Sequence, residues 1–179
     1  MIKVTSGKYR SRNLFVPECL LVPSKSIVRE AIGNMTREYV ANAECLDLFG
    51  GSGSVGIEFL SNGAASCDLV EHNSDCVNAI KKNLSDLKEL NGHVFFKDSI
   101  EFLKETDSTY DIIFIDPPYA DHKAYEEALR TIDVRKLLKP NGMIVLEYEG
   151  DKPPFDNPSF IYSKEKRYGK TKLMVARHS

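Results

Sequence analysis

Between residues 43 and 148 the sequence alternates short apolar runs with segments of helical periodicity. The apolar runs have the length of strands and are expected at residues 43–49, 66–71, 93–97, 110–115 and 143–148. The helices expected between them cover residues 54–63, 73–90, 99–105 and 125–138. Strands that alternate with helices form a parallel sheet with helices on both faces, so the sequence predicts an α/β fold.

Both ends of the chain add to this alternation. Residues 160–168 and 171–177 predict an antiparallel hairpin at one edge of the sheet, and Lys139-Pro140-Asn141-Gly142 predicts a turn. Residues 1–16 are polar and basic and suit a small hairpin, and a helix is expected over 25–40. Its apolar stripe is expected to hold Ile27, Ala31, Met35 and Tyr39. We therefore divide the chain into a basic amino-terminal extension, 1–40, and one compact unit, 41–179.

Composition restricts the class of protein. A chain of 179 residues fits one domain and needs no disulfide staples. Its four cysteines show neither a C-x-x-C pair nor a histidine spacing typical of zinc, so we expect reduced thiols and no metal. No apolar run is long enough to span a membrane and no secretory h-region opens the chain, which predicts a cytoplasmic protein.

The charges are distributed unevenly along the chain. Residues 1–40 hold seven Lys and Arg against three Asp and Glu, and residues 160–179 hold six against one, although the whole chain has a net charge of −2. If the two basic ends came together they would form one face suited to phosphates. The alternative is that these are ordinary solvated charges.

A glycine-rich segment, "LDLFGGSGSVGIE", joins the first expected strand to the helix that follows it. Gly51, Gly53 and Gly56 have the G-x-G-x-x-G spacing of a loop whose backbone approaches a nucleotide cofactor closely. Glu71 ends the next strand, where a carboxylate accepts hydrogen bonds from ribose hydroxyls. NAD(H), S-adenosylmethionine and a tight turn without a ligand are the alternatives at this point.

Asp47 favours one of these alternatives. It lies inside the first strand just before the glycines, where a carboxylate would repel the pyrophosphate of a dinucleotide. S-adenosylmethionine has no phosphate and carries a sulfonium and an ammonium group, and both favour a nearby carboxylate. Asp98, after the third strand, can accept a hydrogen bond from the adenine amino group.

Four segments, "LDLFGGSGSVGIE", "LVEHN", "KDS" and "DPPY", end successive expected strands in this order. Together they resemble class I S-adenosylmethionine-dependent methyltransferases, and more narrowly the RsmD family, which methylates the exocyclic N2 of a guanine in 16S ribosomal RNA. The resemblance extends over nearly the whole chain through four further segments, "SGKYRSRNLFVP", "VPSKSIVREAIGN", "LLKPNGMIVLE" and "RYGKTKLMV". The resemblance implies a Rossmann-like, mostly parallel seven-stranded sheet. The chain departs from the family pattern at Val22, Ser24, Ser26, Ile27 and Gly33.

The resemblance also implies a cofactor, a partner and a set of binding residues. The cofactor is S-adenosylmethionine, the partner is ribosomal RNA or a small-subunit assembly particle, and the protein is expected to be a monomer. The implied cofactor-binding residues are Asp47, Phe49, Gly50, Gly51, Ser52, Gly53, Glu71, His72, Asp98 and Ser99. For His72, an ordinary loop histidine is the alternative.

The segment "YDIIFIDPPYAD" ends a buried strand on an acid and two prolines, which have no N–H to continue a strand ladder. The implied catalytic residues are Asp116, Pro117, Pro118 and Tyr119. An exocyclic amino group is a poor nucleophile because its lone pair is delocalised into the ring. The Asp116 carboxylate and the Pro117 carbonyl can accept its two N–H bonds and aim the lone pair at the methyl group. Tyr119 would stack on the base, once the base has left its helix or loop.

RNA binding is expected at the basic start of the chain, through Lys8, Tyr9, Arg10 and Arg12, with a charged strand edge as the alternative. The DPPY turn also serves adenine N6 and cytosine N4 methylation, so DNA or another RNA is the nearest alternative substrate. An NAD-dependent oxidoreductase is a different class, disfavoured by Asp47 and by the lack of a second domain. A catalytically silent RNA-binding module is a third reading.

Overall fold

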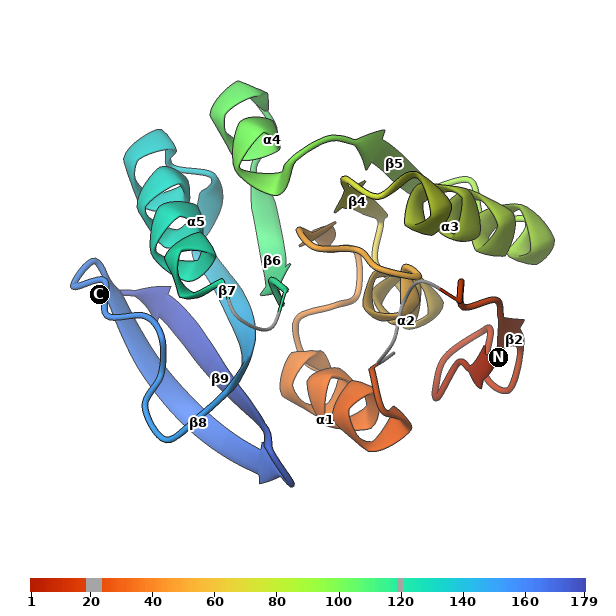
Figure 1. Ribbon diagram of the computed structural model, residues 1–179, viewed down its shortest axis with the longest axis horizontal. Coiled ribbons are helices and arrows are strands. Elements are labelled where there is room, and N and C mark those ends of the chain that lie inside the picture. The colour runs from red at the N-terminus through yellow and green to blue at the C-terminus, as the bar shows by residue number, and fades with distance from the viewer. Residues whose placement is uncertain (19–23, 119–120) are drawn as a thin grey trace.

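The computed structural model describes residues 1–18, 24–118 and 121–179. Its centre is a seven-stranded sheet with the strand order β5-β4-β3-β6-β7-β9-β8 (Figure 1). The sheet strands are β3 (Glu44–Asp47), β4 (Ser66–Glu71), β5 (Gly92–Phe96), β6 (Tyr110–Ile115), β7 (Leu138–Glu149), β8 (Phe160–Tyr168) and β9 (Thr171–His178). The pairs from β5 to β7 are parallel, and β9 pairs antiparallel with both β7 and β8. The predicted α/β sheet with a carboxyl-terminal hairpin is confirmed.

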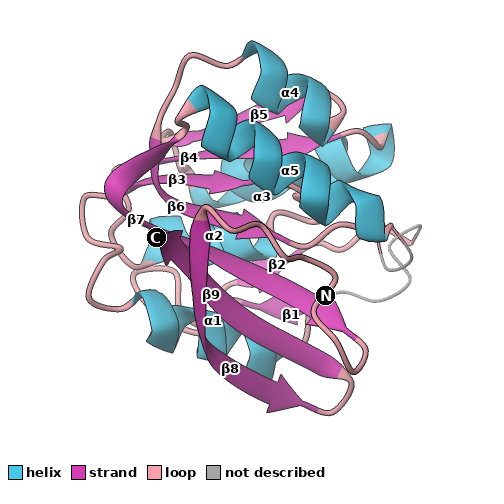
Figure 2. Ribbon diagram, turned by 90° about the vertical axis from the view of Figure 1, so that its left-hand side faces the viewer, coloured by secondary structure: helices cyan, strands magenta, loops and turns pink. Residues whose placement is uncertain are grey.

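Helices cover both faces of this sheet (Figure 2). One face packs against α1 (Ser26–Thr36), α2 (Ser54–Ser61) and α3 (Ser74–Leu87), and the other against α4 (Ser99–Glu105) and α5 (His122–Arg135). Successive residues of a strand point to opposite faces, so Cys45 enters one apolar cluster and Leu46 the other. Among the described helices, none has the length and apolar character needed to cross a membrane.

Several predicted boundaries hold and a few were wrong. β4, α4 and β6 begin and end at the predicted residues. α5 begins three residues earlier than predicted, because the Asp121 side chain accepts a hydrogen bond from the Ala124 N–H and caps the helix. β7 begins at Leu138, so residues 139–142 lie in a strand and not in a turn. The additional residues form an irregularity in the pairing with β6.

The first residues form the expected small hairpin, in which β1 (Ile2–Lys3) pairs antiparallel with β2 (Asn13–Leu14). α1 follows, but its predicted apolar stripe was wrong by about one residue. Ile27 and Tyr39 are exposed, whereas Val28 and Ile32 are buried beside the predicted Ala31 and Met35. The stripe is rotated because α1 packs between the hairpin and the strands β7 and β9 within one apolar cluster.

A buried ion pair connects the hairpin to this layer of helices. Arg29 of α1 and Glu58 of α2 are both almost fully buried, and their charged groups lie 3.2 Å apart. Arg29 also donates to the backbone oxygen of Lys3, and Glu58 accepts from the backbone N–H and the hydroxyl of Thr5. Residues 1–18 are therefore fixed to the helices through charge-assisted hydrogen bonds. The division of the chain at residue 40 stays a prediction.

Replacing one member of this pair should destabilise the protein strongly. Glu58→Gln leaves the Arg29 charge buried without a carboxylate, which costs about 3–5 kcal/mol of the free energy of unfolding. Lys82→Ala is the matched control, because the Lys82–Asp86 pair is exposed and such a pair contributes about 0.3–0.5 kcal/mol. Urea unfolding of both variants measures the difference, and equal midpoints would contradict the assignment.

Candidate active site

The glycine loop lies at the carboxyl end of β3 and is fixed by backbone hydrogen bonds to β4. The N–H of Gly50 donates to Val70 O at 2.8 Å. Gly53 caps α2 with a φ of 82°, a left-handed conformation that favours glycine. A Cβ atom at Gly50 would lie 3.1 Å from Ile80 and 3.3 Å from the Val70 carbonyl. Glycine at position 50 therefore allows the loop to lie close to β4 and α3.

Glu71 connects this loop to the end of β4. One of its carboxylate oxygens accepts from the Gly51 N–H at 3.2 Å, and the other accepts from the Asn73 N–H at 2.7 Å. His72 is exposed, with its Nδ1 atom 3.6 Å from the Glu71 carboxylate. Each carboxylate oxygen has a second lone pair, so Glu71 keeps the capacity to accept from a ligand hydroxyl.

Asp47 is the most deeply buried acid of the site, with 1% of its surface exposed. Its Oδ2 atom accepts from the Gly56 N–H at 3.0 Å, but its Oδ1 atom has no hydrogen-bond partner among the described residues. Burial raises the pKa of Asp47 to about 7, and the nearby Glu71 and Glu147 raise it as well. An enclosed carboxylate oxygen without a partner suits a cationic ligand group.

The start of α4 closes another side of the same edge. Asp98 is exposed and caps α4, and one of its oxygens accepts from the Glu101 N–H at 3.0 Å. Ser99 is buried and donates its hydroxyl to the backbone oxygen of Leu48. Phe49 is half-buried against the apolar cluster under α4 and α5. These three predicted residues are thus brought to the edge that holds the glycine loop.

The turn after β6 lies next to the glycine loop, because Phe114 of β6 pairs with Asp47 of β3. Asp116 is half-buried, Pro117 buried and Pro118 exposed. The carbonyl of Pro118 accepts from the Asp121 N–H at 2.9 Å and closes the turn. Tyr119 lies outside the described residues.

One acid of the site was missed by the sequence analysis. Glu147 ends the apolar part of β7 beside Asp116, and the two carboxyl groups lie within hydrogen-bonding reach of each other. Removal from water raises the pKa of Asp116 well above its usual range, and Glu147 and Asp47 raise it further. The signal was present, because an acid inside the apolar run "MIVLEY" is the feature that had singled out Asp47.

A second residue that the sequence analysis missed, Asn83, holds the glycine loop against α3. It is buried in α3, and its side-chain amide donates to the backbone oxygens of Ser52 and Phe15 while accepting from the Phe15 N–H. One side chain therefore fixes both the glycine loop and the chain that leaves β2. Within the described ranges, no three His, Cys, Asp or Glu side chains are grouped as a metal site.

The comparisons with known proteins agree with this geometry. The family model described as Conserved hypothetical protein 95 matches residues 2–177. The chain belongs to this family, the RsmD family. The Ribosomal RNA small subunit methyltransferase D of Haemophilus influenzae is 35% identical over 94% of this chain and 89% of its own length. The protein of the same name from Escherichia coli K12 is 33% identical over 83% and 75%.

The solved structures extend the agreement to the fold. The structure of yhhF from Escherichia coli superposes on this RsmD family member with a TM-score of 0.89, at 29% identity, and covers 99% of this chain and 98% of its own. The fold is that of a class I methyltransferase.

The four residues expected to bind RNA lie away from the acids of the site. The Lys8 N–H donates to the backbone oxygen of Ser61, the last residue of α2, and the side chains of Lys8 and Tyr9 both contact Glu89. Arg12 donates to the backbone oxygen of Asp86. Helices α2 and α3 begin at the carboxyl edge of the sheet, so their last residues lie at the opposite edge.

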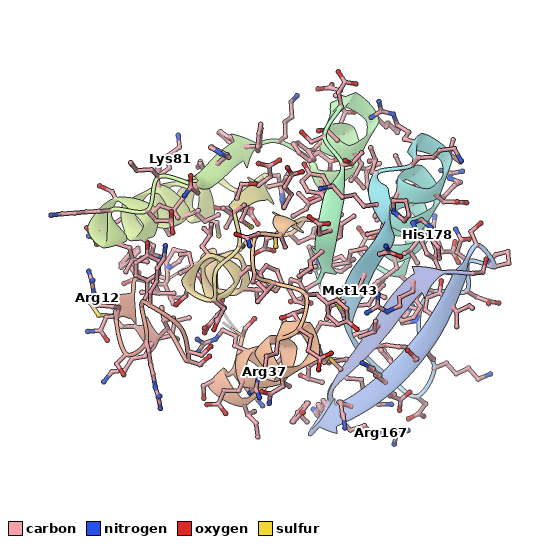
Figure 3. All side chains as sticks on the ribbon, turned by 180° about the vertical axis from the view of Figure 1, so that it is seen from behind. Arg12, Arg37, Lys81, Met143, Arg167 and His178 are labelled. Atoms are coloured by element: carbon pink, nitrogen blue, oxygen red, sulfur yellow. The ribbon has the colours of Figure 1, made fainter. Side chains whose placement is uncertain are left out.

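The two basic ends of the chain do not form one face. Figure 3 shows Arg12, near the start of β2, and Arg167 of β8 on opposite sides of the molecule. α1 lies between the amino-terminal hairpin and the β8–β9 hairpin (Figure 1). If RNA contacts both groups of charges, it must do so at separate places.

The raised pKa of Asp47 predicts how stability depends on pH. The folded chain holds the Asp47 proton up to about pH 7, whereas an unfolded chain loses it near pH 4. The free energy of unfolding should therefore fall as the pH rises between these values. Asp47→Asn removes this contribution, so from pH 5 to pH 8 the variant should lose about 2–3 kcal/mol less than the wild type. Urea unfolding across the series tests this, and parallel curves would contradict it.

Proposed function

We propose that the protein transfers a methyl group from S-adenosylmethionine to the exocyclic N2 of a guanine in small-subunit ribosomal RNA. The observation that carries the proposal is the pairing of β3 with β6, which puts the Asp116–Pro117 turn beside Asp47 and the glycine loop. Membership of the RsmD family and the names of its curated relatives support a ribosomal RNA methyltransferase.

S-adenosylmethionine supplies an electrophilic methyl group on a positively charged sulfur. The residues of the site fit this cofactor, because the unpartnered Oδ1 atom of Asp47 favours a cation and would repel the pyrophosphate of NAD(H). Glu71, beside the loop, is the residue that would accept from ribose hydroxyls, and Asp98 the one that would accept from the adenine amino group. The remaining side chains that we propose to line the cofactor site are those of Phe49, Ser52, His72 and Ser99.

The turn after β6 orients the amino group that is methylated. An oxygen of Asp116 and the carbonyl oxygen of Pro117 accept the two N–H bonds, and the nitrogen lone pair is left aimed at the methyl carbon. The two prolines hold this carbonyl rigidly. Asp116 also stabilises the positive charge that develops on the nitrogen. The proposal assigns Tyr119 the stacking contact with the base.

The choice of guanine N2 rests on the resemblance to the RsmD family. Adenine N6 or cytosine N4 in DNA or another RNA is the second candidate, since the same turn chemistry serves any exocyclic amino group. The ribosomal RNA is larger than the protein, so the basic residues at the far edge can contact phosphates while a base occupies the site. Of these residues, Arg10 is exposed, and its side chain forms no hydrogen bond or ion pair with the described residues, although its backbone N–H donates to the backbone oxygen of Gly7.

Asp116→Ala should reduce methylation far more than it reduces cofactor binding. It removes an oriented acceptor whose interaction is strongest in the transition state, which costs about 3 kcal/mol, or about a hundredfold in rate. Single-turnover methylation of small-subunit ribosomal RNA and calorimetry with S-adenosylhomocysteine are the two measurements. Glu126→Ala, an exposed acid of α5, is the control. Unchanged methylation by Asp116→Ala would contradict the role, and mapping the modified nucleotide distinguishes guanine N2 from the second candidate.

Arg10→Ala should weaken RNA binding and make it less sensitive to salt. Each lost phosphate contact lowers the slope of log K against log salt by about 0.7–0.9. Lys8 and Arg12 are unsuitable for this test, because their internal contacts would be lost too. Lys81→Ala, an exposed lysine of α3 labelled in Figure 3, is the matched control. If the two variants show equal slopes, the amino-terminal hairpin does not contact phosphates.

A further inference from the structure

Asp116 and Glu147 leave the sheet side by side. Ile115 of β6 pairs with Leu146 of β7 in a parallel register, and the two acids are the next residue on each strand. Their carboxyl groups therefore lie within hydrogen-bonding reach of each other. A carboxylate is only an acceptor, so a hydrogen bond between two carboxyl groups requires a proton on one of them.

The surroundings of the pair favour this single proton. Neither acid forms an ion pair with a described lysine or arginine. The ionisable groups that face the pair are Asp47 of β3, Glu149 of β7 and Tyr125 of α5, whose hydroxyl donates to the backbone oxygen of Glu147. The Oε1 atom of Glu147 is enclosed and has no partner among the described residues. Two full negative charges here would repel each other without compensation, so the pair carries one.

We propose that Glu147 is a positioning residue: it accepts a hydrogen bond from the protonated carboxyl group of Asp116 and so presents the other Asp116 oxygen, purely as an acceptor, to the amino group that is methylated. This inference rests on the proposed function. A carboxyl group free to rotate presents either its O–H or its C=O to the base, and only the C=O can accept an N–H bond. Glu147 selects the C=O.

The same pair can take up the proton that the reaction releases. Once the nitrogen carries the methyl group it is positively charged, and its N–H bond breaks as a new O–H bond forms on the acceptor oxygen of Asp116. The original Asp116 O–H proton passes to Glu147, where another O–H bond forms. The pair changes from one negative charge to none, the amine becomes neutral, and Glu147 then returns the proton to water.

Three variants test the positioning role. Asp116→Asn keeps a carbonyl acceptor and an N–H donor for Glu147, so its single-turnover rate should stay within about tenfold of the wild type. Glu147→Ala removes the partner and should lower the rate by about tenfold to a hundredfold while RNA affinity is unchanged. The defect should also grow as the pH falls, because a lone Asp116 that takes up a proton has no partner to hold its O–H away from the base. Glu126→Ala, an exposed acid of α5, is the control and should show neither effect.

Infrared spectroscopy tests the shared proton without any methyl transfer. In the Asp47→Asn background at neutral pH, the carbonyl band of a protonated carboxylic acid should be present and should disappear in Glu147→Ala. A persisting band, an Asp116→Asn rate as low as that of Asp116→Ala, or equal effects of Glu147→Ala and Glu126→Ala would overturn the inference. A wild type that methylates no ribosomal RNA would overturn the proposed function, and the infrared result would still decide whether the pair shares a proton.

Discussion

The repulsion among three poorly hydrated acids is the constraint around which the carboxyl edge of the sheet is built. Asp47, Asp116 and Glu147 come from three strands that end at the same edge. Glu147 raises the pKa of both aspartates, and Asp47 raises that of Asp116 further. Burying such a cluster destabilises the fold. The cluster suits a site where a cation binds and where positive charge moves onto a nitrogen, because the acids then have partners. The repulsion that destabilises the free protein is thus relieved when the cation binds and when positive charge develops in the transition state, so both are stabilised.

Local sequence signals predicted most of the sheet and two of the three acids in this cluster. The strand 110–115 and the acid that ends it could be read from one apolar run and two prolines, and Asp47 from its place inside a strand. Glu147 carried the same signal but had no glycine or proline beside it to mark a site. That Asp116 and Glu147 are neighbours follows from the pairing of β6 with β7, which no local pattern specifies.

Contacts between distant segments account for the rest of what the sequence did not predict. The stripe of α1 turned because strands β7 and β9, more than a hundred residues later, form part of its packing surface. The hairpin that holds Lys8 and Tyr9 was expected near RNA from its composition and its resemblance to the family's start, but its place at the far edge depends on Ser61 and Glu89. Charge patterns indicate a kind of partner, whereas tertiary contacts decide where the charges lie.

The anchoring of the amino-terminal hairpin also has a consequence for the order in which the chain can fold during synthesis. Its side-chain hydrogen bonds reach partners 52–80 residues further along the chain, at Glu58, Ser61, Asn83, Asp86 and Glu89. On the ribosome, the bonds to Glu58 and Ser61 can form only after α2 has emerged. The bonds to Asn83, Asp86 and Glu89 can form only after α3 has emerged. Closing loops of this length costs conformational entropy, which slows the docking of the hairpin onto the helices. The segment that is made first therefore reaches its native position only after the middle of the chain has emerged, and it completes the layer of helices beneath the cofactor loop.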